Sequence, residues 1–371
     1  EPPIPSCCLP NDISGLEYTK GPVRNQGDGY PIAHNELHDT AVAAHMSPSV
    51  TLESFDSLAS SWPDLRQRLR WDSVFVLPPW LGAWWQQFGS GAELYLAAVR
   101  QDDTIIGVAP LLVKGKEASF VGSADVCDYL DFVVAPGSER DFFDTLLDNL
   151  RQKGISRLDL HSLRSDSTAA LDLVSMAEAR GYEVSREQED VSFDLDLPST
   201  WDEYLGMLST KQRHEVRRKL RKLYQAGDVN YRLVDDREAV PRILDTFLKL
   251  FRESRDDKAA FMTPKMESFF TSLTETMGKA GLLSFGVLEF NASPVAALMY
   301  LDYRDTVYLY NSGYDPQYSS LSVGLLSKVL CIKDSIERGK KRFDFLKGSE
   351  TYKYRLGGRE IPIYNCQIVL S

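Results

Sequence analysis

The sequence predicts an α/β protein made of two copies of one unit, each a mixed β-sheet flanked by helices. Residues 94–112 and 283–301 each read as two apolar strands joined by a short polar turn. A helix and a buried strand follow each hairpin, and these strands also correspond: Arg-Leu-Asp-Leu at 157–160 matches Arg-Phe-Asp-Phe at 342–345. The repeated order of hairpin, helix and strand at a nearly constant offset indicates a duplication.

Length and composition allow two ordinary hydrophobic cores. The chain has 371 residues, of which 43% are hydrophobic, enough to fill the interiors of two domains. Its 42 basic and 53 acidic side chains give a net charge of −11, which argues against general binding of nucleic acid. This net charge is still compatible with a local basic surface.

Cysteine and histidine usage predicts a reducing compartment and no metal site. The cysteines are five in number and form no Cys-x-x-Cys pair: Cys7, Cys8, Cys127, Cys331 and Cys366. Neither a disulfide framework nor a zinc site is expected from that pattern. His161 and His214 each lack a partner at the spacing of metal ligands.

Four segments follow from the composition along the chain. Residues 1–47 are rich in Pro, Gly, Asn and Asp without periodicity, which predicts an irregular tail. The first unit spans 48–198, a basic linker helix 199–227, and the second unit 228–371. No segment has the roughly 18 apolar residues of a membrane span, and no leader pattern opens the sequence. We therefore expect a cytoplasmic protein.

The first unit contains an aromatic helix before its hairpin. Pro78 and Pro79 are placed to open this helix, which buries Trp80, Trp84 and Phe88. We interpret the tryptophans as packing residues rather than ligand-stacking residues. After the hairpin the pattern predicts strands and helices in alternation, at 127–134, 142–152, 156–163, 167–180 and 191–197.

The linker is the most charged helix of the chain. Ser209 to Gln212 has the form of a capping box, and an apolar line then runs through Val216, Leu220 and Leu223. Six cations surround that line: Arg213, Arg217, Arg218, Lys219, Arg221 and Lys222. Two readings stay open, a solvated face or a surface that meets a phosphate-bearing substrate, because six like charges on three turns repel one another.

The second unit repeats the plan of the first. Its pattern predicts strands at 230–234, 282–290, 295–302 and 307–311 and helices at 236–254, 264–277 and 322–338. A loop at 313–316 separates the last of these strands from the last helix. Serines and Gly324 at that junction suit an anion such as a pyrophosphate, although serines before a helix are more often N-caps.

The second unit carries the features of a known family. Its strand meander, small-residue turn and helix start resemble the GCN5-related N-acetyltransferase (GNAT) fold. The segment 343–355, Phe-Asp-Phe-Leu-Lys-Gly-Ser-Glu-Thr-Tyr-Lys-Tyr-Arg, together with the basic helix, resembles the double-unit branch with FemAB-type aminoacyltransferases and CelD/BioF2-like acyltransferases. The resemblance covers about residues 50–371. Val323 departs from the proline that often precedes the helix glycine.

The resemblance implies an N-acyltransferase that uses acetyl-CoA or another acyl-CoA. It places the cofactor at the second unit's helix start, on Ser320, Ser322, Val323, Gly324 and Leu325. We expect the acceptor to be the amino group of a sugar, a nucleotide-sugar or another precursor of cell-envelope polysaccharide. One alternative is FemAB-like transfer from aminoacyl-tRNA, which the basic helix would serve. The other is a non-catalytic scaffold that binds a nucleotide-sugar or a partner.

Attack of an amine on a thioester needs a base, close positioning and a donor to the oxyanion, but no covalent nucleophile. Asp128, at the mouth of a first-unit strand, is the first candidate for the base, against the reading of an exposed strand-end aspartate. Glu350 and Tyr352 follow the last inner strand of the second unit and are further catalytic candidates. Asp344, inside an apolar strand, is expected to bond to backbone or to Arg342.

Substrate contacts are expected from aromatic and basic side chains beside these groups. The candidates are Tyr129, Tyr314, Lys347, Lys353 and Arg355. The cations suit an anionic acceptor, with plain surface positions as the alternative.

Overall fold

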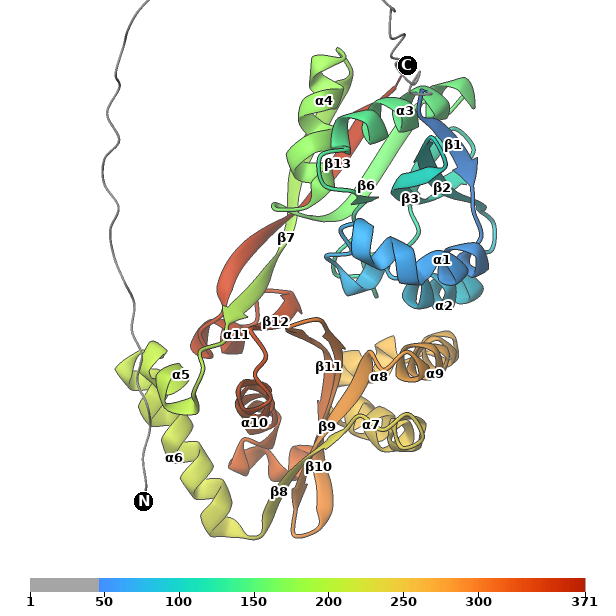
Figure 1. Ribbon diagram of the computed structural model, residues 1–371. Helices are drawn as coiled ribbons and strands as arrows, with labels where there is room; N and C mark the ends of the chain where they lie inside the picture. Colours follow the sequence, from blue (N-terminus) through green and yellow to red (C-terminus); the bar gives the residue numbers. More distant parts are fainter. Residues whose placement is uncertain (1–46, 371) are drawn as a thin grey trace, which may run out of the picture. The chain divides into compact units, whose positions relative to one another are not determined.

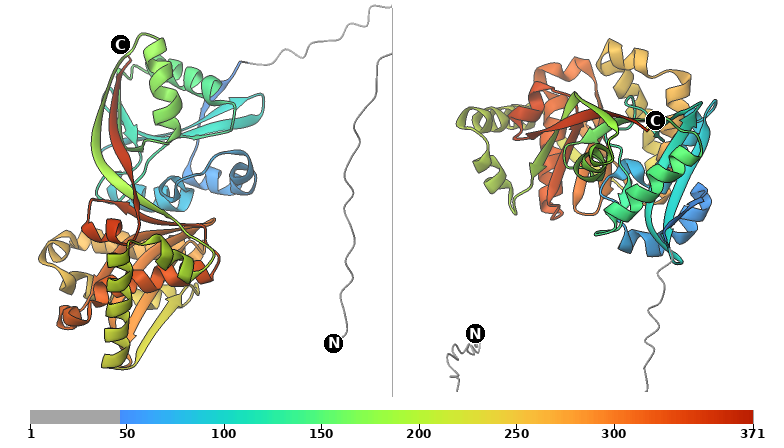
Figure 2. Two further views of the ribbon diagram at one scale, coloured as in Figure 1. Left: turned by 90° about the vertical axis from the view of Figure 1, so that its left-hand side faces the viewer. Right: turned by 90° about the horizontal axis from the view of Figure 1, so that it is seen from above.

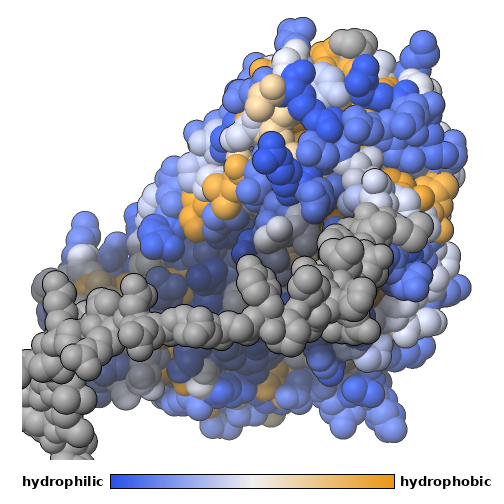
Figure 3. Space-filling view, turned by 45° about the horizontal axis from the view of Figure 1, so that its top comes forward, coloured by the Kyte–Doolittle hydropathy of each residue, from blue (hydrophilic) through white to orange (hydrophobic). Residues whose placement is uncertain are grey.

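One thirteen-stranded sheet runs through the computed structural model, which describes residues 47–370 (Figure 1). The predicted tail, except for its last residue, lies outside these residues. No helix within 47–370 is long and apolar enough to cross a bilayer. The face drawn in Figure 3 is largely hydrophilic, with hydrophobic residues in small patches, as is usual for a folded domain.

The first half of the described chain contains seven strands and four α-helices. They are β1 (Ser49–Leu52), α1 (Phe55–Arg68), α2 (Pro78–Phe88), β2 (Glu93–Gln101), β3 (Thr104–Lys114), β4 (Glu117–Phe120), β5 (Val133–Val134), α3 (Glu139–Gln152), β6 (Arg157–Arg164), α4 (Val174–Ala179) and β7 (Glu183–Asp196). A 3₁₀ turn, η1 (Val74–Val76), precedes α2, and a π-helical turn, η2 (Ala169–Leu173), opens α4.

Two linker helices and the second half follow. They are α5 (Trp201–Met207), α6 (Thr210–Ala226), β8 (Val229–Val234), α7 (Val240–Ser254), α8 (Asp256–Phe261), α9 (Pro264–Lys279), β9 (Leu283–Phe290), β10 (Ser293–Tyr303), β11 (Thr306–Tyr314), the 3₁₀ turn η3 (Pro316–Leu321), α10 (Val323–Glu337), β12 (Arg342–Lys347), α11 (Thr351–Arg355) and β13 (Arg359–Val369).

The strand order confirms the predicted duplication. It reads β1-β2-β3-β4-β6-β13-β7-β12-β11-β10-β9-β8, so each half contributes the same series outward from the centre. The predicted hairpins are β2–β3 and β9–β10, and the two Arg-x-Asp-x segments are β6 and β12. The strands β4 and β6 pair in parallel, as do β11 and β12.

The two halves exchange their last strands at the centre of the sheet. β7, which ends the first half, pairs with β12 of the second half, while β13 pairs with β6 of the first half. The exchanged strands also pair with each other, from Arg359 opposite Asp194 to Val369 opposite Glu183. Figure 2 shows β7 and β13 twisted side by side.

Apolar faces fix the helices on the sheet. In the second half, α7 and α9 cover one face through Phe247 and Phe270, both 0% exposed. The helix α10 covers the other face through Val323 and Leu326 (Figure 1). The predicted apolar line of α6 also lies in that second core, and its capping box from Ser209 is present.

Several elements differ from the sequence prediction. The segment 127–134 is strand only at β5, because Asp131 caps a helix start instead of joining a ladder. The short β4 and the final β13 were not predicted. β11 continues through Tyr314, so the loop predicted at 313–316 begins later; Gly313 there allows the backbone of α7 to come within 2.3 Å of where a Cβ would be.

Replacing Ile363 with alanine tests the exchange. Ile363 is 0% exposed on β13, between Arg164 of β6 and Asp190 of β7. We expect Ile363→Ala to lower the free energy of unfolding by about 2–5 kcal/mol, with faster hydrogen exchange in both β6 and β7. The exposed neighbour Glu360→Ala serves as the control. Faster exchange confined to the second half would contradict this arrangement.

Candidate active site

The start of α10 gathers positive charge from α6. Ser322 has a left-handed backbone (φ 58°), and its Oγ accepts a hydrogen bond from Lys219 Nζ at 3.0 Å. Lys222 Nζ donates to the backbone oxygen of Ser320 at 2.8 Å. The free N–H groups and positive dipole end of a helix start favour an anion. Two ammonium groups strengthen that preference.

The predicted cofactor residues lie together at this junction. Ser320 is exposed, Leu325 is half-buried and Val323 is buried beneath them. Packing requires a glycine at position 324, because a Cβ there would lie 2.8 Å from the ring of Tyr314. A bulky replacement would displace that ring, so such a change cannot serve as a test that leaves the packing intact.

The equivalent helix of the first half has the opposite charge. α3 begins after Ser138, and its first turn carries Glu139 and Asp141. Carboxylates at a helix start occupy the position that an anionic ligand would take. Of the two related helix starts, the one at α10 is therefore suited to phosphate.

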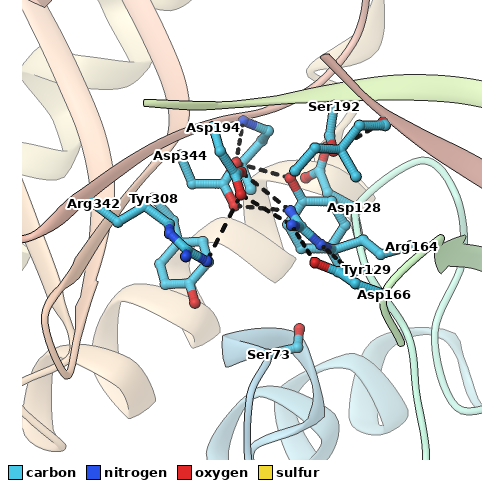
Figure 4. A network of polar contacts seen from close by, with 12 residues as sticks. Ser73, Asp128, Tyr129, Arg164, Asp166, Ser192, Asp194, Tyr308, Arg342 and Asp344 are labelled. Carbon is cyan, nitrogen blue, oxygen red and sulfur yellow. Dashed lines mark hydrogen bonds and ion pairs between the residues drawn. The ribbon is translucent and has the colours of Figure 1, made fainter. Parts of the chain in front are cut away.

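A buried charge network lies on the face of the sheet opposite α10, on strands β6, β7 and β12 (Figure 4). Asp344 of β12 stands directly across from Asp194 of β7, which places two carboxylates side by side. Arg164, from the end of β6, binds both Asp194 oxygens at 2.9 and 3.1 Å and lies 3.6 Å from Asp344. Tyr129 donates its hydroxyl proton to Asp344 Oδ1 at 2.8 Å, and its ring lies 4.9 Å from the Arg164 guanidinium.

A cavity of about 340 Å³ opens on this network, and we call it the polar pocket. Both halves of the chain contribute charged side chains to its wall: Arg70, Asp72, Asp131, Arg164, Asp166, Asp172, Arg304, Arg342 and Asp344. Tyr129, Tyr303 and Tyr308 complete its aromatic surface. A pocket with this many paired charges can bind a polar group that carries both hydrogen-bond donors and acceptors.

Two carboxyl groups of the polar pocket have raised pKa values. Burial, with Asp194 as a second carboxylate nearby, raises the pKa of Asp344 to about 8. Burial also raises the pKa of Asp131 to about 7, although its carboxylate accepts hydrogen bonds from the N–H groups of Thr168 and Ala169. A carboxyl that titrates near neutrality can exchange a proton with a bound amine.

The loop after Asp344 explains much of the segment 343–355. Leu346 has a left-handed backbone (φ 63°), which is costly for such a residue, and its N–H donates to Asp344 Oδ1 at 2.7 Å. Lys353 Nζ donates to the backbone oxygens of Leu346, Lys347 and Gly348 at 2.6–3.0 Å. The motif therefore holds a strained turn beside the polar pocket.

That loop corrects the role predicted for Lys353. Its side chain is 2% exposed, and Glu350 lies 2.9 Å from its Nζ. All three protons of the ammonium are used inside the protein, so Lys353 shapes the loop instead of contacting a substrate. Arg355 is exposed on α11, and its role in substrate binding stays a prediction.

The other predicted residues lie around the same loop. Asp128 accepts a hydrogen bond from the Lys347 N–H at 3.0 Å, and burial raises the pKa of its carboxyl. Lys347 Nζ pairs with Glu189 at 3.1 Å, so it is not free for an anion. Burial acts to raise the pKa of Glu350, but the Lys353 ammonium lowers it overall, which makes Glu350 a weak base.

Tyr352 is held in a separate contact. Its ring lies 5.1 Å from Lys328 Nζ, and burial raises the pKa of its hydroxyl well above the usual value. A neutral phenol can donate a proton but not remove one at neutral pH.

The sequence reading overlooked Arg164 and Asp194 and gave Asp344 only a structural role. One signal was present for Asp194 and Asp344, since both are charged residues inside predicted strands, where an unpaired charge is costly. Arg164 directly follows the predicted strand 156–163. Their partners come from three strands far apart in the sequence, so no spacing could pair them.

Comparison with known proteins identifies the fold. Residues 210–354 match the family model described as an acetyltransferase (GNAT) domain. The structure resembles that of FemX with a TM-score of 0.59 and 12% identity, over 86% of this chain and 96% of FemX. It also resembles a conserved protein of unknown function from Bacteroides thetaiotaomicron, with a TM-score of 0.55 and 10% identity, over 86% and 99% of the two chains. No curated protein matches the chain in sequence. The chain thus has the fold of FemX over most of its length, and the part of it at residues 210–354 is similar to a GNAT acetyltransferase domain.

Proposed function

We propose that this protein is an acyl-CoA-dependent N-acyltransferase that acts on the amino group of a sugar or of a cell-envelope polysaccharide precursor. The observation that carries the proposal is the cationic start of α10, formed with Lys219 and Lys222, within the segment that matches the GNAT domain. Acyl-CoA, when bound, supplies an acyl group activated as a thioester. Lys219, Lys222 and the first N–H groups of α10 would hold its phosphates.

Strands β11 and β12 lie between this helix start and the polar pocket. Their pairing ends at Tyr308 and Asp344, although β11 continues to Tyr314. Beyond that point backbone hydrogen bonds no longer join the two strands. We place the meeting of donor and acceptor there, because α10 packs on one face of the strands and the polar pocket lies on the other.

The polar pocket suits a protonated amine as the resting form of the acceptor. Its carboxylates attract an ammonium group, and Asp344, in the fraction of molecules in which it is ionised, takes the proton before attack. The Tyr129 hydroxyl fixes the carboxylate that it contacts. A volume of about 340 Å³, near the lower end of ligand pockets, suits a headgroup and not a whole polymer.

A second candidate is transfer from aminoacyl-tRNA, as in the FemAB-type branch. The observation that favours it is the outer face of α6, where Arg217, Arg218 and Arg221 are exposed. Arg218 is paired with Glu215 at 2.8 Å, whereas Arg217 and Arg221 are placed to contact a nucleic-acid backbone. A binding titration with charged tRNA, compared with acetyl-CoA, separates the two candidates.

Neutralising the lysines tests the donor site. We expect Lys219→Met or Lys222→Met to raise the KM for acetyl-CoA by about 5- to 30-fold, because each loses a charge-assisted contact worth roughly 1–2 kcal/mol. Lys211→Met, at an exposed position of the same helix, is the matched control. Equal effects at all three positions would point to nonspecific attraction, which rising salt also weakens.

Isosteric changes identify the base. Asp344→Asn should lower turnover by about 10²-fold or more with little change in the KM for acetyl-CoA, because proton removal is lost and not donor binding. Activity of the wild type should rise as the pH passes about 8, where Asp344 ionises. Asp128→Asn is the companion variant. A large loss there with full turnover in Asp344→Asn would assign the base to Asp128.

The raised pKa also predicts a pH dependence of stability. The folded state keeps the Asp344 proton up to about pH 8, whereas an unfolded chain releases it near the ordinary value of 3.8. The stabilisation from the bound proton is therefore complete below about pH 4 and is lost as the pH rises through about 8, at up to about 1.4 kcal/mol per pH unit. Urea unfolding should show a steeper fall in the wild type than in Asp344→Asn. Parallel curves would mean that Asp344 is ionised throughout.

A further inference from the structure

A second and larger cavity lies beside the polar pocket. It has a volume of about 900 Å³ and is lined by α1, α2, the end of α9 and the turn between β10 and β11. We call it the aromatic pocket after its half-buried walls Phe55, Trp62, Trp85 and Tyr303. The remaining wall combines aliphatic residues such as Leu77 and Pro78 with polar ones such as Gln67 and Arg66, and aromatic and aliphatic residues together form its larger part. Such a wall favours apolar matter over hydroxyl groups.

The two pockets share a wall. Tyr303 and Arg304, at the turn between β10 and β11, line both of them. The Arg304 guanidinium lies 5.2 Å from the Tyr303 ring centroid and 3.2 Å from Asp72, in an ion pair exposed to solvent. Exposed ion pairs contribute little to stability, so this side chain can move aside at low cost. One elongated ligand can therefore occupy both pockets.

A glycine in the middle of α2 keeps the aromatic pocket open. Gly82 lines the pocket, and a Cβ built on it would have its nearest neighbour, Phe55 Cγ, 3.9 Å away. Its φ lies outside the left-handed region, so the backbone does not require glycine. Glycine inside a helix is less stable than alanine, and packing gives no reason for it here. The absence of a side chain instead preserves the volume of the cavity.

We propose that the aromatic pocket binds an apolar chain of the acceptor, so that the acceptor is an amphiphile. Its amine-bearing polar headgroup lies in the polar pocket, and an alkyl-like chain passes Tyr303 and Arg304 into the aromatic pocket. The identification of the headgroup as acceptor rests on the proposed function. The binding of the chain depends only on the two cavities and can be measured without catalysis.

Calorimetry on the full chain, without CoA, tests chain binding. The probes are glucosamine and its butyl, hexyl and octyl glycosides, used below the concentrations at which they form micelles. Burial of each methylene should tighten binding about four-fold, so the octyl glycoside should bind about 250-fold more tightly than the butyl glycoside. No dependence on chain length would overturn the proposal.

Closing the pocket gives the decisive variant. Gly82→Leu places a side chain in the cavity at a helical position with room for a Cβ, and it should weaken binding of the octyl glycoside at least about 10-fold while leaving glucosamine unchanged. Gly206→Leu is the matched control, since Gly206 lies in α5 with no atom within 4 Å of a Cβ. Ala59→Trp, at an exposed position of α1 that lines the pocket, closes it independently should Gly82→Leu misfold. If Gly82→Leu and Ala59→Trp bind the octyl glycoside as tightly as Gly206→Leu does, the proposal is overturned.

Release of CoA from acetyl-CoA separates this inference from the proposed function. Transfer to the octyl glycoside with a KM well below that of glucosamine supports both. Transfer with the same KM for all four amines overturns the amphiphile and leaves the acyltransferase standing. Binding that depends on chain length without CoA release from acetyl-CoA or longer acyl-CoAs would overturn the proposed function and keep an apolar ligand in the aromatic pocket.

Discussion

The exchange of β7 and β13 is the constraint on which the rest of this structure depends. Each half of the chain completes the sheet of the other, and the two exchanged strands pair with each other over eleven registered positions. The halves cannot separate without breaking three ladders, so their relative position is fixed by backbone hydrogen bonds as well as by packing. A site built from both halves can therefore be rigid, which ligand positioning requires.

The exchange also creates the electrostatic problem at the centre of the site. It sets Asp194 of β7 directly opposite Asp344 of β12, and like charges in that position oppose strand pairing. Arg164 of β6 compensates by binding Asp194 with both ends of its guanidinium. It lies close to Asp194 because β13 pairs with β6 and joins the two halves. The compensation is unequal, since Asp344 lies farther from Arg164, and its carboxyl has the raised pKa. The pairing of β7 with β12 thus gives Asp344 a carboxyl that titrates near neutrality.

The two halves differ in the charge of their equivalent helix starts and in how much they contribute to the pockets. The helix start of the second half is cationic through lysines donated by the linker helix, and the equivalent start in the first half carries Glu139 and Asp141. The first half instead supplies most of the walls of both pockets, from Tyr129 and Arg164 to the aromatic helices α1 and α2. In our proposal one copy of the unit keeps the donor and the other has become a receptor for the acceptor, so one fold serves two chemistries.

The sequence by itself determined the duplicated α/β architecture, because hydrophobic periodicity and turn residues are local properties that recur in both halves. It also located the helix start that we propose as the anion site, since Ser322, Gly324 and the helix that follows are contiguous. Only the tertiary structure decided which half pairs with which last strand, because β7 and β13 pair with strands that lie far from them in the sequence. It likewise decided the surroundings of the Lys353 and Asp344 side chains. Lys353 is surrounded by carbonyl oxygens of its own loop, and Asp344 faces Asp194 and Arg164 from distant strands. Burial and charge at those positions depend on neighbours that no local spacing can reveal.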